Sequence, residues 1–416
     1  MNILIIHQNY PGQFKHLGPA LVQEGHKVVA LPMSQKPLDP LGGVTRVGYY
    51  PGRSSTEGVH PWVADFETKT IRAEAAFVAA QKLKVQGFEP DVILAHPGWG
   101  ESLFLKEVWP HAKLGIYCEF FYSAGGADVG FDPEFYQVSQ ADACRIRLKN
   151  LNNTLHFESA DAGLSPTRWQ ASTFPQPFAS RIQVIHDGID TAALQPNPQA
   201  TLRLNLPSGE LHLSRADELI TFVNRNLEPY RGFHVFMRSL PRLLEQRPHA
   251  RVLIIGGDGV GYGAGSPGGK TWRQRMTDEV RPQLTQDQWA RVNFLGNVSY
   301  EAFVRVLQIS TVHVYLTYPF VLSWSLLEAM SVSCAIVASR TAPLLEAIEH
   351  DQTGRLVDFF DATALADEVV SLLNDPNARA RLSANARAHA VAHYDLRSIC
   401  LPRQLEWVRA LSERSR

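Results

Sequence analysis

Cysteine is scarce in this chain of 416 residues, and its few copies are scattered. The four cysteines are Cys118, Cys144, Cys334 and Cys400, with no C-x-x-C pair among them. A disulfide framework or a structural zinc site needs cysteines that are closely spaced or numerous for the chain length. The sequence therefore argues against both and favours a reducing compartment, so we expect a cytoplasmic protein.

Excess charge and long apolar runs are also lacking. The formal net charge is -1 and hydrophobic residues make up 45% of the chain, as in globular proteins. A near-neutral chain has no general affinity for nucleic acid. No apolar run approaches the ~20 residues that cross a bilayer, so we expect no transmembrane segment. The apolar start, residues 1–7, is short and has no basic segment, so it is predicted to form a first strand, not a signal peptide.

Several familiar catalytic motifs are missing. There is no G-x-S-x-G, no H-E-x-x-H and no aspartate cluster suited to a metal ion, and no pair of carboxylates can be given acid and base roles. Ala264–Thr271 fits a relaxed P-loop pattern, but eight residues separate it from a strand predicted to end at Ile255. A working P-loop joins its strand tightly to its helix. The glycine-rich segment is therefore predicted to shape a loop, not to bind ATP.

The chain does contain a recurring alternation of short apolar runs and helical patterns, which is typical of parallel sheets covered by helices. In the first half the predicted strands are 3–6, 28–31, 91–95, 114–117, 162–164 and 182–185, with helices at 17–23 and about 66–86. In the second half they are 219–223, 251–255, 292–295, 312–316 and 335–338, with a helix at 233–246. We predict an α/β fold with two doubly wound Rossmann-like domains, because 416 residues exceed one ordinary core.

The predicted domain boundary follows a change in composition. Residues 187–190 are followed by Pro196, Pro198 and polar residues, a linker composition. The last 40 residues or so have a helical pattern with a break near residues 394–395. We therefore place one domain at 1–195, completed by a C-terminal helix at about 396–416, and the other at 196–395.

A single carboxylate, Glu328, lies in a predicted strand–loop–helix–strand unit of the second half. Strand 312–316 ends at a turn containing Pro319, and Glu328 follows in the first turn of a short helix. Ligands of doubly wound sheets bind at the carboxyl ends of strands, beside helix N-termini. A carboxylate there can accept two hydroxyl hydrogen bonds, as a ribose diol would offer. Alternatively, Ser325–Glu328 is an S-x-x-E capping box, which needs no ligand.

Two arginines, Arg225 and Arg231, lie between a predicted strand and a predicted helix. Two guanidinium groups on such a loop suit a diphosphate, because arginine forms forked hydrogen bonds to phosphate oxygens. The alternative is a pair of solvated loop arginines, or one arginine paired with Glu228. The sequence leaves both interpretations open.

The first half offers candidates that rest on position. Gly12 follows the first strand, and a glycine there lets backbone N–H groups approach a phosphate. His96 follows strand 91–95 and Glu119 follows strand 114–117. Both are expected at the carboxyl ends of strands. Residues of this kind are more often ordinary loop residues than catalysts.

Together these segments resemble the GT-B glycosyltransferases of family 4 over nearly the whole chain. Residues 7–17, HQNYPGQFKHL, resemble the N-terminal glycine loop of one bacterial subgroup, and residues 184–190, VIHDGID, resemble the hinge usually written V-I-P-N-G-V-D. Arg225 and Arg231 resemble the Arg and Lys that hold the donor diphosphate. Residues 327–330, LEAM, and the strand after them resemble the nucleotide-binding block.

That block departs from the family pattern E-x7-E. The second Glu, which in the family touches the ribose, corresponds to Glu328, but Phe320 stands where the first Glu would touch the donor sugar. The family's Arg/Lys spacing is commonly one residue shorter. A His that members often place after a mid-domain strand corresponds here to Cys118 or Glu119. The ribose role therefore carries over, while the sugar contact does not.

The resemblance implies two domains facing across a cleft and a glycosyltransferase of the hexosyltransferase type. It implies a retaining reaction in glycan biosynthesis with a nucleotide-diphosphate sugar, UDP- or GDP-linked, and with no cofactor or metal. The C-terminal domain would hold this donor, and the N-terminal domain would shape the site for a glycan, lipid-linked or protein acceptor. The predicted catalytic residues are Arg225, Arg231, His96 and Glu119. The predicted donor-binding residues are Gly12, Gln13, Arg225, Arg231, Gly257, Phe320, Val321, Leu322, Ser323, Leu327 and Glu328.

Two other functions remain open. One is a sugar-nucleotide epimerase on the same fold, which would need clear acid and base groups. The other is a donor-binding protein that has lost catalysis, which Phe320 would explain.

Overall fold

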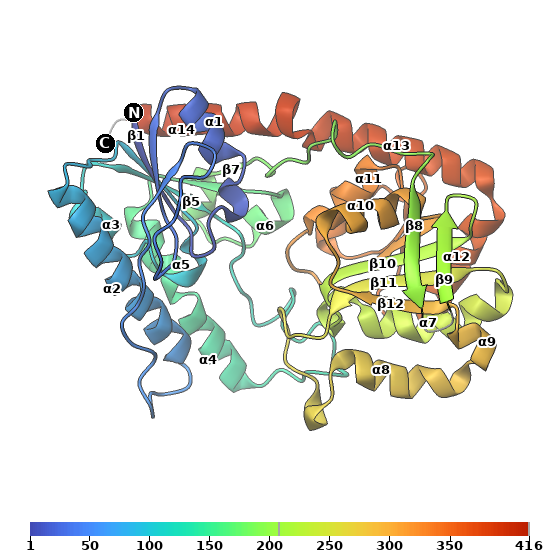
Figure 1. Ribbon diagram of the computed structural model, residues 1–416. Coiled ribbons are helices and arrows are strands. Elements are labelled where there is room, and N and C mark those ends of the chain that lie inside the picture. The colour runs from blue at the N-terminus through green and yellow to red at the C-terminus, as the bar shows by residue number, and fades with distance from the viewer. Residues whose placement is uncertain (207–208, 415–416) are drawn as a thin grey trace. The chain divides into compact units, whose positions relative to one another are not determined.

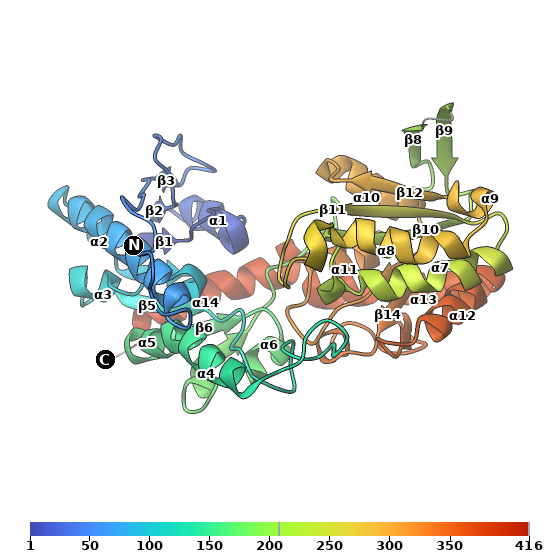
Figure 2. The ribbon, with the colours of Figure 1, turned by 90° about the horizontal axis from the view of Figure 1, so that it is seen from below.

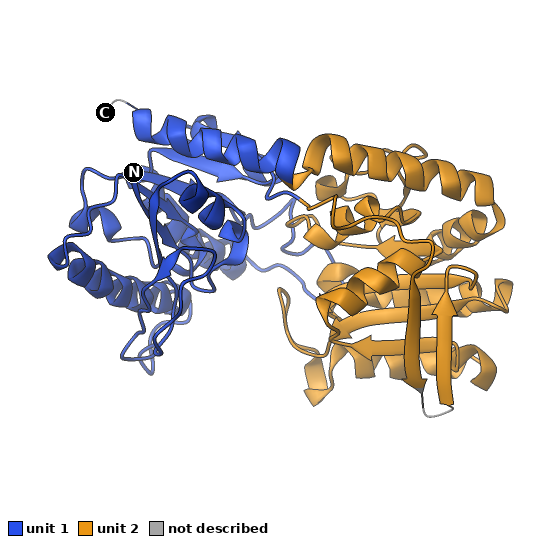
Figure 3. Cartoon of the chain, turned by 45° about the horizontal axis from the view of Figure 1, so that its top comes forward, with its two compact units in different colours: residues 1–188, 397–416 blue, residues 189–396 orange. Residues whose placement is uncertain are grey.

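The computed structural model describes residues 1–206 and 209–414, and it divides into two compact units (Figure 3). Unit 1 comprises Met1–Gly188 and Arg397–Arg416, and unit 2 comprises Ile189–Leu396. The chain passes from unit 1 to unit 2 between residues 188 and 189, which is earlier in the linker than the expected boundary at 195–196. Ile189 belongs with unit 2 because its N–H donates to the carbonyl of Tyr394 (2.8 Å) and its carbonyl accepts from the N–H of Leu396 (2.8 Å).

Unit 1 is built on a seven-stranded sheet in the order β3-β2-β1-β4-β5-β6-β7. Its strands are β1 (Asn2–Ile6), β2 (Lys27–Leu31), β3 (Thr45–Arg46), β4 (Val92–Ala95), β5 (Lys113–Tyr117), β6 (Ala162–Ser165) and β7 (Ile182–Val184). All neighbours pair in parallel, and β1 pairs with both β2 and β4. The strand order therefore reverses between β1 and β4, which confirms the predicted doubly wound topology.

Helices cover both faces of this sheet (Figure 1). Ile3 and Ile5 of β1 pack with α1 and α14, while Leu4 and Ile6 pack with α2 and α3. Successive side chains of a strand point to opposite faces, so a strand covered on both sides is apolar throughout. The helices are α1 (Leu17–Gln23), α2 (Ala64–Val85), α3 (Leu105–Val108), α4 (Gln140–Lys149), α5 (Leu151–Ser159), α6 (Arg168–Ser172), α14 (Leu401–Glu413) and the 3-10 turns η1 (Gly12–Phe14), η2 (Pro97–Trp99) and η3 (Phe178–Arg181).

Unit 2 repeats this plan with a six-stranded parallel sheet in the order β12-β11-β10-β13-β14-β15. Its strands are β10 (Leu219–Asn226), β11 (Arg251–Gly257), β12 (Val292–Gly296), β13 (Val312–Tyr315), β14 (Ile336–Ser339) and β15 (Arg355–Val357). Strand β10 pairs with both β11 and β13. The order reverses between β10 and β13, so this pair marks the switch point at which a ligand is expected.

The helices of unit 2 also form two layers (Figure 2). Leu219 and Val223 of β10 share a core with α10, α11 and α13, and on the opposite face Phe222 stacks on Phe236 of α7 with ring centres 4.4 Å apart. The helices are α7 (Phe233–Gln246), α8 (Trp272–Val280), α9 (Gln286–Trp289), α10 (Tyr300–Ile309), α11 (Trp324–Ser331), α12 (Ala362–Asn374), α13 (Pro376–Tyr394) and the 3-10 turns η4 (Pro229–Arg231), η5 (Pro267–Gly269), η6 (Arg281–Gln283) and η7 (Ala342–Leu344). A π-helical turn (Leu396–Cys400) begins at the last residue of unit 2 and leads into α14 of unit 1.

The sequence analysis missed a hairpin at the start of unit 2. Residues predicted to be linker are followed by two antiparallel strands, β8 (Thr201–Leu206) and β9 (Gly209–Ser214). Leu202, Leu204 and Leu211 are partly buried against the core of the unit. They alternate with polar residues, the period-2 pattern of a half-buried strand.

In the described part of the chain, no helix has both the length and the apolar character needed to cross a bilayer.

Candidate functional site

Arg231 connects the segment after β10 to the loop after β13, at the switch point of unit 2. It ends η4, just after β10, and is only 6% exposed. Its Nη1 donates to the hydroxyl of Thr317 (2.8 Å) and to the carbonyl of Val321 (3.1 Å), both in the loop after β13. A solvated loop arginine would be exposed and without such bonds. That alternative is therefore wrong for Arg231.

Arg225 differs from Arg231 although both were predicted to hold a diphosphate. It lies at the carboxyl end of β10 and is exposed. Within residues 1–206 and 209–414 the structure records no hydrogen bond or ion pair for its side chain. Its donors are therefore available to solvent or to a ligand. This exposure fits both interpretations that the sequence left open for Arg225.

Glu228 is a buried carboxylate that sequence reasoning considered only as an arginine partner. It makes no ion pair with Arg225 or Arg231 in the described chain. Its oxygens instead accept hydrogen bonds from three consecutive backbone N–H groups, those of Gly261, Tyr262 and Gly263, at 3.1–3.3 Å. The glycine-rich loop after β11 is therefore folded around a side chain of the protein itself.

The P-loop-like segment behaves as the sequence analysis predicted, as a loop. Lys270 pairs with Asp278 of α8 (2.6 Å), and the hydroxyl of Thr271 caps α8 by accepting from the N–H of Gln274 (3.2 Å). In a P-loop these two side chains would face phosphate and magnesium. Here both are committed to the helix that follows.

Glu328 does not form the capping box that the sequence offered as the alternative to a ligand contact. Helix α11 has Ser323, not Ser325, as its N-cap, and the Ser323 hydroxyl accepts from the N–H of Ser325 (3.3 Å). Glu328 is therefore in the second turn, beyond reach of a cap. One of its oxygens accepts a hydrogen bond from the hydroxyl of Tyr300, at the start of α10 (2.7 Å). Sequence reasoning missed Tyr300, because 28 residues separate the two and no motif links them.

Phe320 lies inside an aromatic cluster. It is 4% exposed, and its ring contacts those of Tyr230 and Tyr262, with centroids 5.7 and 5.1 Å away. Tyr230 also packs against Tyr318 (4.7 Å). The structure therefore supports the core-packing interpretation of Phe320 more than a sugar contact.

The other predicted donor-binding residues are divided between core and loop. Leu327 is fully buried, and Val321 and Leu322 are nearly so. The N–H of Ser323 donates to the hydroxyl oxygen of Tyr315 (3.1 Å), so this donor already has a partner. Gly257 ends β11, where an added Cβ would lie 3.0 Å from the side chains of Asn226 and Asn297.

Unit 1 brings four of its predicted site residues together. His96 follows β4, Glu119 follows β5, and Gln13 lies in η1 after β1. The amide of Gln13 donates to a carboxylate oxygen of Glu119 (3.5 Å), and the other oxygen is 3.7 Å from Nε2 of His96. Gly12 has φ +45°, and an added Cβ would lie 2.3 Å from the ring of His7. The cluster lies at the switch point between β1 and β4.

The electrostatic state of His96 follows from its burial. Burial holds the pKa of His96 well below its usual value, so the ring is neutral at pH 7. Its Nδ1 accepts from the N–H of Gly98 (3.2 Å), which leaves the proton on Nε2. This buried N–H has no hydrogen-bond acceptor within the described residues. His96 therefore presents a neutral donor beside the carboxylate of Glu119.

Three residues of this cluster were missed as site residues. His7, directly after β1, shares a hydrogen bond with Gln13 (2.8 Å) and meets His96 edge to face. Tyr117 stacks on His96 and donates to both oxygens of Asp187 (3.0 Å each). Asp187 was assigned to the hinge from the sequence alone. These contacts join residues as far apart in the chain as His7 and His96, so spacing along the chain could not reveal them.

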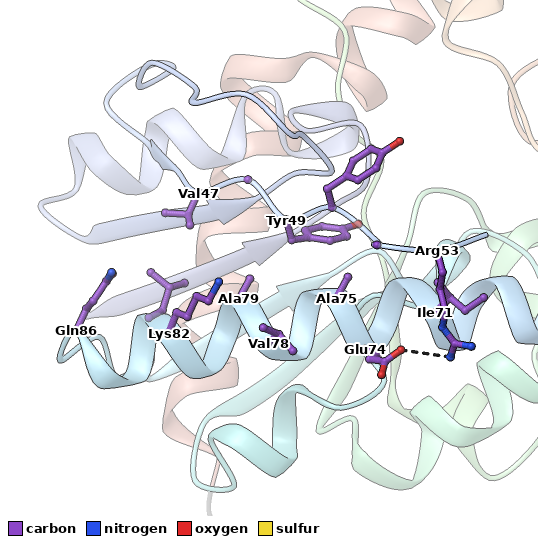
Figure 4. Close-up of a pocket in the computed structure, with 14 residues that line it drawn as sticks. Val47, Tyr49, Arg53, Ile71, Glu74, Ala75, Val78, Ala79, Lys82 and Gln86 are labelled. Carbon is purple, nitrogen blue, oxygen red and sulfur yellow. Dashed lines mark hydrogen bonds and ion pairs between the residues drawn. The ribbon is translucent and has the colours of Figure 1, made fainter. Parts of the chain in front are cut away.

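A cavity in unit 1 lies outside the predicted sites. It has a volume of about 570 Å³ and runs along α2, beneath residues 47–53. Figure 4 shows an apolar floor that includes Ala75, Ala79 and Ile71, closed at one end by the ion pair of Arg53 and Glu74 (3.4 Å). The carboxyl ends of β1 and β4 supply none of its lining residues.

The fold and these sites define a GT-B protein: two Rossmann-like domains, each with candidate ligand residues at its switch point. The family model described as "Glycosyl transferase family 4 group" matches residues 24–194, and "Glycosyl transferases group 1" matches residues 210–389. The chain belongs to the family 4 group of glycosyltransferases, which confirms the resemblance noted in the sequence.

Individual relatives agree with this assignment. A D-inositol 3-phosphate glycosyltransferase of Corynebacterium efficiens is 30% identical over 213 residues, 50% of this chain and 47% of that protein. The chain thus matches about half the length of such curated relatives. Sucrose-phosphate synthase of Thermosynechococcus elongatus has a similar structure (TM-score 0.74, 20% identity, 100% of both chains). So has Anabaena HepE in complex with UDP and glucose (TM-score 0.67, 16% identity, 99% of this chain and 100% of that one). Both likenesses concern the fold.

Proposed function

We propose that this protein transfers a sugar from a nucleotide-diphosphate sugar to an acceptor. The observation that carries the proposal is the arrangement at the switch point of unit 2. There Arg231 bridges the segments after β10 and β13, and Arg225 is exposed at the end of β10. Guanidinium groups at such a place suit a diphosphate. The UDP complexes of HepE favour a UDP-linked donor, with GDP as the other candidate.

Within unit 2, each proposed role follows from chemistry. Arg225 and Arg231 would stabilise the negative charge of the departing diphosphate, the largest electrostatic demand of the reaction. Glu328 would accept hydrogen bonds from the ribose diol, in place of the hydroxyl of Tyr300 that it accepts now. Gly257 and the residues from Phe320 to Leu327 would shape the site around these charged groups.

Within unit 1, we propose that the His7–His96–Glu119 cluster contacts the reacting sugar or the acceptor. The neutral Nε2–H of His96 would donate to a sugar oxygen, and the carboxylate of Glu119 would accept from a hydroxyl. Gly12 and Gln13 remain predicted donor contacts. We also propose that the reaction retains the anomeric configuration, as the family resemblance implies. We propose that it needs no metal ion, because the arginines supply the positive charge that a metal ion would otherwise provide.

The test is an assay with UDP- and GDP-sugars, first without any acceptor. A glycosyltransferase is expected to release free sugar and nucleoside diphosphate slowly. An epimerase, for which the histidine–carboxylate cluster supplies acid and base groups, would instead change the sugar while it stays linked to the nucleotide. A binding protein would give neither product.

Repeating the assay in EDTA is expected to leave the rate of sugar release unchanged. If EDTA abolished this activity and Mg²⁺ or Mn²⁺ restored it, metal independence would be contradicted.

Glu328→Gln is expected to weaken binding of UDP or GDP by about 1–3 kcal/mol, the usual range for a hydrogen bond to a charged group. Isothermal titration calorimetry measures this change. Helix α11 is capped by Ser323, so the thermal midpoint should stay the same. Glu301→Gln, which alters an exposed carboxylate paired with Arg305, is the matched control. Unchanged nucleotide affinity in the Glu328 variant would remove Glu328 from the donor site.

A further inference from the structure

The glycine-rich loop after β11 is held in one conformation by Glu228. This carboxylate is 2% exposed and accepts from the N–H groups of residues 261–263. Three successive N–H groups converging on one anion form a nest, an arrangement that often binds phosphate. Glycine at 261 allows this close approach, because an added Cβ would lie 2.5 Å from Glu228 Oε1 and would displace the carboxylate. The loop is therefore built around this carboxylate and does not offer its nest to a ligand.

The same loop carries Tyr262 to a defined position. The guanidinium carbon of Arg231 lies 5.2 Å from the centre of the Tyr262 ring, within the range of a cation–π contact. The ring also meets Phe320 at 62° and lies near Tyr230 (6.4 Å). Tyr262 nevertheless stays 46% exposed. A side chain with that much exposure contributes little to a core, so its fixed place beside Arg231 calls for another reason.

We propose that Glu228 and Tyr262 are positioning residues for the donor diphosphate. Glu228 fixes the backbone of residues 261–263, and this backbone holds the Tyr262 ring beside the guanidinium of Arg231. The ring and the bonds to Thr317 and Val321 set the plane of the guanidinium before a ligand arrives. Preorganised donors bind a phosphate more tightly than donors that must first be ordered. This inference rests on the proposed function, in which Arg231 holds the diphosphate.

A merely structural role predicts a different result. If the loop only supports the fold, its variants should lose thermal stability and should affect all nucleotide ligands alike. A positioning role predicts a loss confined to ligands that carry the diphosphate. UDP with uridine, and GDP with guanosine, are therefore the ligand pairs to compare.

The experiment is calorimetric titration of Tyr262→Ala, Tyr262→Phe and Glu228→Gln with these four ligands, with Glu301→Gln as the control. Tyr262→Ala is expected to weaken binding of the nucleoside diphosphate about tenfold, while nucleoside affinity stays within about twofold. Tyr262→Phe keeps the ring and should restore most of the affinity. Glu228→Gln should show the same selective loss, because an amide nitrogen cannot accept the loop N–H groups.

Two negative results can be told apart. If the wild-type protein binds neither UDP nor GDP, the proposed function fails and this inference fails with it. If the wild type binds one of them, and the folded variants bind it as tightly or lose diphosphate and nucleoside affinity equally, only the positioning role is overturned. Tyr262 is half exposed, so Tyr262→Ala provides a folded variant even if Glu228→Gln is unstable.

Discussion

Arg231→Ala is expected to lose both nucleoside diphosphate binding and about 2–4 kcal/mol of unfolding free energy. The stability loss arises because the buried Val321 carbonyl loses its donor, and the buried Thr317 hydroxyl keeps only its bond to the Tyr318 carbonyl. Each unsatisfied buried polar group costs about 1–3 kcal/mol. The binding loss arises because a forked, charged donor disappears from the switch point. Urea denaturation and calorimetric titration with UDP and GDP measure the two effects separately.

Arg225→Ala provides the contrast that makes this result interpretable. Arg225 is exposed and has no bond within the described chain, so its removal should change stability by less than about 0.5 kcal/mol. It should still weaken diphosphate binding, and far more than nucleoside binding. Arg231→Lys keeps the charge but not the fork and should be intermediate. A folded Arg231→Ala protein with wild-type UDP and GDP affinity would show that Arg231 supports only the fold.

The sheets could be predicted from the sequence because each central strand leaves a local signal. Residues 3–6 and 92–95, and residues 219–223 apart from Thr221, are apolar because helices cover both faces of their sheets. The helical ends were also predictable where one residue decides the backbone, as at Gly25, whose φ of +84° closes the end of α1. Such features depend on neighbouring residues alone, so they can be predicted without knowing the tertiary structure.

The details of the site could not be predicted in the same way. Two serines, Ser323 and Ser325, could each cap the helix that contains Glu328, and only the turn after β13 decides between them. The pairing of Glu328 with Tyr300, and of Glu228 with the loop at 261–263, joins residues about 30 positions apart. Such contacts depend on which way each side chain points once the strands are aligned, and sequence spacing does not fix that direction.

For Phe320, the direction of the side chain decides which result a substitution is expected to give. The sequence gives two interpretations of a phenylalanine at the family's sugar-contacting position: altered sugar choice or core packing. On the first, Phe320→Glu would restore a hydrogen-bond acceptor and change the ranking of donors. The structure places the ring at 4% exposure between Tyr230 and Tyr262. A carboxylate there would be buried among these aromatic rings.

We therefore expect Phe320→Glu to lower the unfolding free energy by about 3–5 kcal/mol, combining lost aromatic packing with the burial of an ionisable group. Phe320→Leu keeps an apolar side chain, so it should lower the unfolding free energy less and leave a folded protein. Its relative kcat/KM values across a panel of UDP-sugars should match those of the wild type, because the position packs the core instead of contacting the sugar. Urea denaturation tests the first expectation and the donor panel the second. A stable Phe320→Glu protein would contradict the core-packing interpretation. So would a changed ranking of kcat/KM among donors in Phe320→Leu with unaltered UDP affinity, which would support a sugar contact by Phe320.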